Sequence, residues 1–463
     1  MELFTIKGLD KLLIEEGLIS GLESQNDLLF YDKCNWLISS IARKNYAIES
    51  DFGDYANIHS ETIRKMLGRG YRTKILEPLE ELDIIVINDK YSSDKFSKSY
   101  SFKKKAIDKG IAKTKILSGR FTSRYDKYLN DKFEEIYSDP LYRKILDNLS
   151  RLKVKGTQGD FLSYVVDPEN VNNFKIDRYI AYFNSLFNLN DSSSAKEVFK
   201  SNVSFEPRLT QYGRVYHLGA SIPRLIRRIL ITNDNKPLWE VDMSSAQFSL
   251  LIMWWANLHN YVGEESKQFQ EEYYRNLELV ANGGIYKYIS SNSEPFRKLR
   301  YDDMKQKILS VLNAEYNPGI YNRELKRLFP SFMEWINDIK KDRGYKEVSH
   351  LGQNLESAVF VEVYKDLPSD MFSLIIHDCI LTTEENIQLV EERLTYRVLS
   401  LFTMTFNSKD EIKGLFKVGR VSLNEEDYEA FHAEKYVKEI MEDFNLKTLT
   451  DYHNWIENPY SLM

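Results

Sequence analysis

Two short apolar runs, far apart in the sequence, each carry one aspartate at a strand-like end. The first run lies in Trp239–Ser249 and leads into Asp242, and the second lies in Leu374–Leu381 around Asp378. Short apolar, β-branched runs of this kind predict buried strands. Aspartates at two strand ends can meet in space and share divalent cations, and two metal ions about 4 Å apart stabilise the attacking and leaving oxygens of a phosphoryl displacement. The pattern therefore predicts a metal-dependent site where these strands end.

The first 105 residues alternate between helical and strand-like patterns. Helical periodicity covers Leu28–Ala47, a short helix with Ser60 as its candidate cap lies in Asn57–Leu67, and a further helix is predicted over Arg72–Leu82. The stretches Ile84–Ile87 and Ser99–Phe102 are strand-like and are separated by a polar turn. Two helices followed by a hairpin with a basic tip resemble a winged helix-turn-helix domain. Such domains bind nucleic acid or other proteins, so both kinds of contact stay open.

Composition adds a charge pattern to this picture. The chain is 43% hydrophobic and 29% charged, as is ordinary for a globular protein, and its net charge of −6 lacks the basic excess usual in nucleic-acid-binding domains. Basic residues nevertheless gather in two stretches, Lys103–Lys127 and Arg208–Arg228, and acidic residues gather in Glu425–Asp443. The net charge therefore does not exclude a local basic surface.

The cellular location of the protein is predicted from its cysteines and from its apolar segments. Cys34 and Cys379 are its two cysteines, which favours a reducing compartment, and no Cys/His cluster has zinc-ligand spacing. The N-terminus lacks the apolar stretch of a signal peptide. The longest apolar run, Phe248–Ala256, is shorter than the ~20 residues of a membrane span. We expect a cytoplasmic protein without a membrane partner, in which this run is a buried helix.

The segments around the two aspartates resemble motifs A and C of the family A DNA polymerases and the single-subunit phage RNA polymerases. The family's motif A often reads Asp-Tyr-Ser-Gln-Ile-Glu, and the phage enzymes have a longer, Ser-rich form; Asp242, followed by two serines and Gln247, lies between the two. His377-Asp378 matches the His-Asp of motif C, although Cys379 stands where most DNA polymerases have Glu. The resemblance implies that Asp242, Met243 and Asp378 hold two Mg²⁺ ions, with Mn²⁺ as an alternative.

Two features of these motifs leave alternatives open. The Glu at the end of the DNA polymerase motif A, which is associated with excluding ribonucleotides, has no obvious counterpart, so the choice of sugar stays open. Asp242 would also serve as a helix N-cap, since it lies after a strand and before an apolar helix. His377-Asp378 on its own would be an ordinary turn.

A third motif is expected on the helix that follows residue 300. Motif B of the family is an Arg, Lys, Phe, Tyr series at four-residue spacing, which points several side chains at one incoming nucleotide. The matching register here is Tyr301, Lys305, Leu309 and Asn313. The resemblance implies that Lys305 neutralises the triphosphate and acts as a general acid, and that Leu309 lies under the base. The expected nucleotide contacts are Lys305, Leu309, Asn313, Gln247 and Arg300, with Lys307 as a substitute; the alternative is an amphipathic helix with solvated lysines.

Further segments resemble parts of the family that contact the primer and template. Gly213-Arg214, followed by Pro223-Arg224, resembles Thr-Gly-Arg-Leu-Ser with its downstream Asn-Ile-Pro, which implies that Arg214 and Arg224 hold the nucleic-acid backbone. The helix Gly352–Ala358 resembles the Gln helix before motif C, so Gln353 is expected near the minor groove. His377 completes the expected nucleic-acid contacts. A weaker likeness links Gly284-Ile285-Tyr286 to a turn in the fingers, and the alternatives are surface arginines, a buried helix and a glycine turn.

The resemblance covers roughly residues 208–385 and implies a mixed α/β fold. We expect a right-hand polymerase core with an antiparallel palm sheet and helical fingers, plus an N-terminal winged-helix-like domain. The expected regions are 1–105 (winged-helix-like), 106–202 (helical, thumb-like), 203–258 and 346–424 (palm), 259–345 (fingers) and 425–463 (an acidic helical extension). No stretch resembles a 3′–5′ exonuclease.

The implied activity is nucleotide addition to a 3′-hydroxyl by a two-metal mechanism, most simply DNA-directed DNA synthesis without proofreading. The expected partners are a DNA template and primer, with RNA as an alternative, and nucleoside triphosphates. A single-subunit RNA polymerase or primase-like enzyme is a second hypothesis. A replication initiator that binds DNA through its winged helix, with a palm that does no chemistry, is a third. The sequence does not distinguish replication from a mobile-element or defence role.

Overall fold

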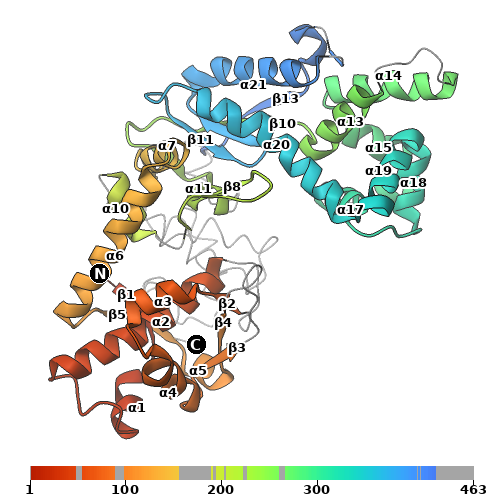
Figure 1. Cartoon of the computed structure of the whole chain (residues 1–463). Coiled ribbons are helices and arrows are strands. Elements are labelled where there is room, and N and C mark those ends of the chain that lie inside the picture. The colour runs from red at the N-terminus through yellow and green to blue at the C-terminus, as the bar shows by residue number, and fades with distance from the viewer. Residues whose placement is uncertain are drawn as a thin grey trace, which may run out of the picture. The chain divides into compact units, whose positions relative to one another are not determined.

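The structure is a computed structural model of the chain and describes residues 2–47, 55–88, 98–155, 189–190, 194–202, 205–222, 227–259, 266–403, 405–406 and 408–423 (Figure 1). The chain divides into two compact units. The first unit comprises Met1–Asp139, Lys155–Glu206 and Asn424–Met463, and the second comprises Pro140–Val154 and Pro207–Leu423. The described residues form a mixed α/β fold with small antiparallel sheets, as the sequence predicts.

The first unit is built around one long helix and a three-stranded antiparallel sheet. Its elements are β1 (Glu2–Ile6), α1 (Leu9–Glu15), α2 (Gln25–Ala47), β2 (Ala56–Asn57), α3 (Ser60–Leu67), the π-helical turn η1 (Arg72–Leu76), α4 (Glu77–Glu81), β3 (Ile85–Asn88), β4 (Ser99–Phe102), α5 (Lys104–Lys109), β5 (Ile111–Lys115), α6 (Gly119–Tyr137) and α10 (Ala195–Ser201). The sheet has the order β2-β4-β3, and β1 pairs with β5. The apolar faces of α2, α3, α4 and α6 meet in one core.

The helices and strands predicted for this region are found, with two local differences. Ser60 begins α3 but does not cap it, because His59 is the N-cap and its Nδ1 accepts a hydrogen bond from the Glu61 amide at 3.4 Å. The helix predicted over Arg72–Leu82 starts as a π-helical turn and ends at Glu81. Most of the polar turn between β3 and β4, and the acidic segment after residue 424, lie outside the described residues.

The second unit contains a four-stranded antiparallel sheet in the order β11-β12-β10-β13. Its strands are β10 (Trp239–Met243), β11 (Ser373–Ile376), β12 (Cys379–Thr382) and β13 (Phe416–Arg420). Two smaller pairs are β6 (Leu152–Val154) with β9 (Leu230–Thr232), and β7 (Arg208–Leu209) with β8 (Val215–Tyr216). Both strands that the sequence predicts around the aspartates are present, and the second is one half of a β-hairpin.

Helices cover this sheet and extend beside it. They are α7 (Pro140–Leu149), α11 (Leu218–Ser221), α13 (Ala246–Leu258), α14 (Lys267–Ala281), α15 (Ile285–Asn292), α16 (Glu294–Arg297), α17 (Tyr301–Asn313), α18 (Ile320–Leu328), α19 (Pro330–Arg343), α20 (Lys346–Asp366) and α21 (Ile387–Leu401). Helices α20 and α21 pack on the sheet, and α14 to α19 form a group beside it that α13 and α20 join to the sheet (Figure 1). The apolar run Phe248–Ala256 is the buried helix that the sequence predicts. Within the described ranges, none of the helices combines the length and the apolar character that crossing a bilayer requires.

Candidate active site

The two aspartates lie at the same end of the four-stranded sheet. Asp242 is the fourth residue of β10 and pairs with Cys379, the first residue of β12. Asp378 occupies the second position of the two-residue turn that joins β11 to β12, and its carbonyl accepts a hydrogen bond from the Met243 amide at 3.2 Å. Both aspartates are half-buried. Backbone pairing thus brings acidic residues from two segments 136 residues apart to the same end of the sheet.

The backbone is strained at two residues close to the aspartates in the chain. Ser245, which caps α13 directly after β10, and His377, the first residue of the hairpin turn, both have a φ of 52°. A positive φ at the first turn residue alone is what a type II′ turn requires, and glycine is the usual residue there. Residues held in the left-handed region cost of order 1–3 kcal/mol and cluster at functional sites. The chain therefore places two non-glycine residues where glycine would fold more easily.

A buried tyrosine from the helical group reaches the two aspartates. Burial raises the pKa of Tyr286, and Tyr301, Asp378 and Asp242 raise it further. The ring of Tyr286 meets the ring of Tyr301 edge-on, with centroids 6.2 Å apart. The sequence pattern marks both tyrosines only weakly, the first in the turn after Gly284 and the second at the start of the four-residue series. Tyr286 on α15 is thus electrostatically coupled to both aspartates, and Tyr301 connects α17 to Tyr286.

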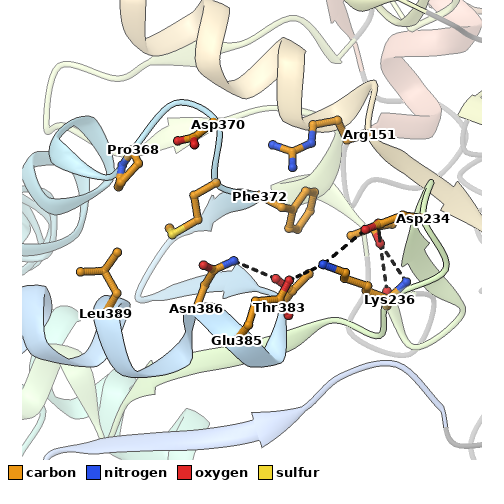
Figure 2. Close-up of a pocket in the computed structure, with 12 residues that line it drawn as sticks. Arg151, Asp234, Lys236, Pro368, Asp370, Phe372, Thr383, Glu385, Asn386 and Leu389 are labelled. Carbon is orange, nitrogen blue, oxygen red and sulfur yellow. Dashed lines mark hydrogen bonds and ion pairs between the residues drawn. The ribbon is translucent and has the colours of Figure 1, made fainter.

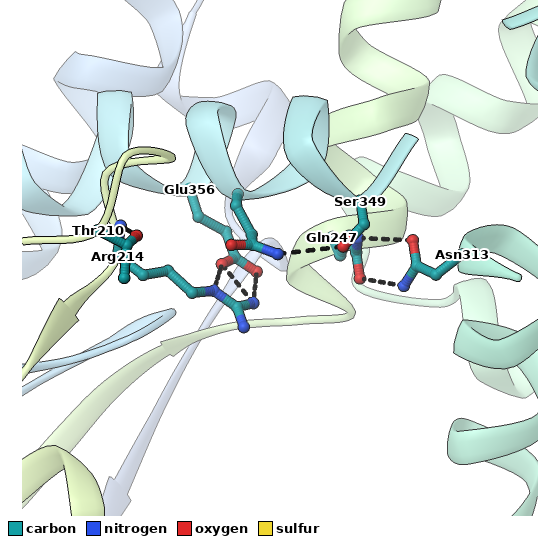
Figure 3. Close-up of polar contacts among 7 residues, drawn as sticks. Thr210, Arg214, Gln247, Asn313, Ser349 and Glu356 are labelled. Carbon is teal, nitrogen blue, oxygen red and sulfur yellow. Dashed lines mark hydrogen bonds and ion pairs between the residues drawn. The ribbon is translucent and has the colours of Figure 1, made fainter. Parts of the chain in front are cut away.

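Arg214 is held by a carboxylate that the sequence reasoning missed. Its Nε and Nη2 donate to the two carboxylate oxygens of Glu356 on α20, at 2.8 to 3.2 Å, and Glu356 is only 4% exposed (Figure 3). Burial raises the pKa of Glu356 to about 7, with Asp378 adding to the rise and Arg214 opposing it. The one signal for Glu356 in the sequence is its spacing of three from Gln353, which places both on one face of a helix.

The loop that carries Arg214 lies tightly against α20. Gly213 has a φ of +83°, and a Cβ at this position would come within 2.3 Å of the Ser357 hydroxyl. The neighbouring Tyr212 ring stacks on His350 of α20 at 3.7 Å between centroids. Glycine is therefore required at 213 both by its conformation and by this close approach.

Two predicted nucleotide contacts pair with each other. Gln247 Nε2 donates to Asn313 Oδ1 at 3.0 Å, and Asn313 Nδ2 donates to Gln247 Oε1 at 3.1 Å (Figure 3). This pair joins α13, directly after the first aspartate, to the end of α17.

The other predicted contacts are spread over the helices. Lys305 is exposed on α17 and Leu309 is half-buried, while the buried stripe of that helix is Met304, Ile308 and Leu312. Arg300 is exposed and forms an ion pair with Asp303 at 2.9 Å.

On α20, Gln353 donates to the Ser349 hydroxyl at 3.0 Å. The His377 ring meets the Tyr216 ring edge-on at 5.4 Å, and burial lowers its pKa. Arg224 lies outside the described residues.

A pocket lies at the opposite end of the hairpin from Asp378. It is a polar pocket of about 340 Å³, lined among others by Arg151, Thr383 and Asn386. Lys236 forms ion pairs there with Glu385 at 2.6 Å and Asp234 at 3.4 Å (Figure 2). Both cations and carboxylates line the pocket, and none of the predicted site residues does.

The donors at the aspartate end fit a magnesium site that is completed by a substrate. Mg²⁺ is usually held by one or two carboxylates together with substrate phosphates, not by a cage made of protein alone. Asp242 and Asp378 provide two carboxylates at this end of the sheet. In the part of the chain that the structure describes, no group of three or more His, Cys, Asp or Glu side chains is arranged to hold a metal ion. Asp242 and Asp378 are therefore the two described carboxylates that a metal ion at this end of the sheet would use.

No protein-family model matches this sequence, and no curated protein is similar enough to count as a relative.

Proposed function

We propose that the second unit is a nucleotidyltransferase that adds nucleotides to a 3′-hydroxyl on a nucleic-acid template. The observation that carries this proposal is the meeting of Asp242 and Asp378 at one end of an antiparallel sheet, through the Met243 amide and the Asp378 carbonyl. The order β11-β12-β10-β13 is compatible with a palm. The helices α14 to α19 lie between β10 and β11 in the chain, where fingers are expected.

Each residue of the site would have a separate role in the proposed reaction. Asp242 and Asp378, with Met243 beside them, would hold two Mg²⁺ ions, which when bound lower the pKa of the attacking hydroxyl and offset charge on the leaving pyrophosphate. Lys305, exposed on α17, would bind the triphosphate and donate a proton to the leaving group. The Gln247–Asn313 pair would face the sugar, and Leu309 would contact the base.

The nucleic acid would be held by polar groups on α20 and the preceding loop. Glu356 keeps the Arg214 guanidinium in a fixed orientation, so Arg214 would contact a phosphate or a base edge as part of a pair and not as a mobile side chain. Gln353 lies one turn away on the same helix. His377, in its strained turn, would meet the primer end.

Two alternatives have specific support. The neutral Gln247–Asn313 pair provides no carboxylate at the sugar, which favours a ribonucleotide-using polymerase or primase. The order α2-β2-α3-η1/α4-β3-β4 in the first unit is compatible with a winged helix, which would favour a DNA-binding initiator if the second unit is inactive.

A primer-extension assay distinguishes the proposed polymerase from the primase-like enzyme and from the DNA-binding initiator. Purified protein would be offered deoxy- and ribonucleotides separately, with Mg²⁺ or Mn²⁺, on primed and unprimed DNA and RNA. Extension of a primer with deoxynucleotides supports the polymerase, and synthesis from ribonucleotides without a primer supports the primase-like enzyme. DNA binding without any nucleotide addition would leave the initiator as the better account.

A further inference from the structure

Three cationic side chains converge on a glycine turn in the first unit. A Cβ built on Gly68, which follows α3, would lie 3.8 Å from Arg124 Nη1 and 3.9 Å from Lys33 Nζ. Arg124 Nη1 and Lys33 Nζ are therefore separated by no more than the sum of these two distances. A Cβ on Gly70 would lie 3.6 Å from Lys74 Cε. Three helical segments, α2, η1 and α6, bring these side chains to one turn.

The cluster has no anionic counterpart among the residues that the structure describes. Lys33 and Lys74 form no ion pair there, and Arg124 donates to a neutral acceptor, the Met66 carbonyl, at 3.1 Å. The pKa of Lys33 is lowered first by burial and then by the positive charges of Arg124 and Lys74. Like charges at this spacing repel each other, and the half-buried position of Lys33 weakens solvent screening. A bound anion would offset this repulsion.

We propose that Lys33, Lys74 and Arg124 form a binding site for a backbone phosphate of a nucleic acid at the Gly68–Gly70 turn. This turn lies between α3 and η1, which are followed by the β3-β4 hairpin. Arg64 and Arg69 are exposed on or next to it, so a phosphate at the cluster would have further basic groups beside it. Glycines at 68 and 70, with φ values of 90° and 71°, leave the surface above the turn without side chains at these two positions.

Nucleic acid is favoured over a free phosphate by the further exposed cations beside the cluster. Arg64 and Arg69 would contact a neighbouring phosphate of the same backbone, which a single free phosphate does not provide. The inference uses the nucleic-acid part of the proposed function and does not need nucleotide addition, so a binding measurement tests it separately from the polymerase chemistry.

The test is the salt dependence of duplex binding by the full chain. Affinity for a short labelled DNA duplex would be measured by fluorescence anisotropy at increasing KCl concentrations. Each of Lys33→Gln, Lys74→Gln and Arg124→Gln should lower the slope of log K against log salt by about 1, because one phosphate contact is lost. The control is Lys11→Gln, which removes an exposed lysine of α1 in the same unit and should leave the slope unchanged.

Thermal unfolding distinguishes binding from a purely structural role. Positive charges near the C-terminal end of α3 would also stabilise that helix. If the cluster serves only this role, the three variants lower Tm and keep the wild-type slope, which would overturn the inference. If the cluster binds phosphate, Lys33→Gln keeps or raises Tm because repulsion is relieved, and its slope falls.

A further arm uses inorganic phosphate at constant ionic strength. If phosphate raises the Tm of the wild type but not of Lys33→Gln, while both bind the duplex with the same slope, the site binds a free phosphate compound and the assignment to a nucleic-acid backbone is wrong.

Discussion

Glu356 holds Arg214 in a bidentate ion pair, with Nη2 and Oε2 2.8 Å apart. The two residues are 142 positions apart and join the loop after β7 to the middle of α20. The Glu356 carboxylate is buried and electrostatically coupled to Asp378, whereas the Arg214 side chain is 28% exposed, so the pair connects the interior of the site to its surface. An arginine expected to contact nucleic acid is therefore already oriented before any ligand arrives.

This pair should give folding stability a distinct dependence on pH. The pKa of Glu356 is raised from 4.5 to about 7 in the folded protein, so the folded state binds a proton more readily than the unfolded state. Stability from this group should then fall as pH rises from about 4.5 to about 7, by at most roughly 3 kcal/mol. Denaturant unfolding of wild type and Glu356→Gln across this range checks it. Parallel curves for the two proteins would contradict the raised pKa.

The Gln247–Asn313 pair should act as one unit. Alanine at either position removes both hydrogen bonds, so the double variant should be less destabilised than the sum of the single variants, with a coupling of about 0.5–1.5 kcal/mol. The ratio of kcat/KM for deoxy- and ribonucleotides should change in the same way in both single variants. If the effects on stability are additive and the ratio of the kcat/KM values is unchanged, the Gln247–Asn313 pair has no role in selecting the nucleotide.

The strained turn at His377 should show a trade-off between stability and activity. His377→Gly relieves the left-handed conformation and should leave stability unchanged or raise it by up to about 1 kcal/mol, while nucleotide addition falls because the primer contact is lost. Asn235→Gly is the matched control, because Asn235 has a φ of 65° in a turn at the other end of the sheet. It should change stability alone. Full activity in His377→Gly would remove that residue from the site.

Lys305 should contribute more than its basic neighbours. Lys305→Ala removes a charged contact to the triphosphate and should lower kcat/KM for nucleotides by roughly 10- to 100-fold, with little effect on duplex binding. Arg300 is engaged by Asp303, and Lys307 lies 5.3 Å from the Tyr321 ring, so their alanine variants should change kcat/KM little. If kcat/KM falls more in Arg300→Ala or Lys307→Ala than in Lys305→Ala, the contact to the triphosphate belongs to that residue and not to Lys305.

Local patterns predict the strands and helices that position this site, and they fail where the contacts are distant in sequence. The apolar runs around Asp242 and Asp378 predict both strands, because strand propensity depends on neighbouring residues. The partners of Arg214 and Gln247 depend on how α17 and α20 pack, and no local pattern contains that information. The N-cap of α3 shows a similar, smaller difference. The sequence predicts Ser60 as the cap, and the structure has His59, one residue earlier.

The account depends on Asp242 and Asp378 serving one metal centre, and single-turnover nucleotide addition by their asparagine variants tests this most directly. Asn keeps the shape and removes the charge, so Asp242→Asn and Asp378→Asn should each fold and bind nucleic acid nearly as the wild type does. Each should lose roughly 1,000-fold or more in the rate of nucleotide addition, about 4 kcal/mol, and the double variant should be little slower than either single variant. Asp370→Asn, in the polar pocket at the other end of the hairpin, is the matched control and should keep the wild-type rate. Wild-type rates in both single variants would contradict the assignment of a shared metal centre and of a polymerase.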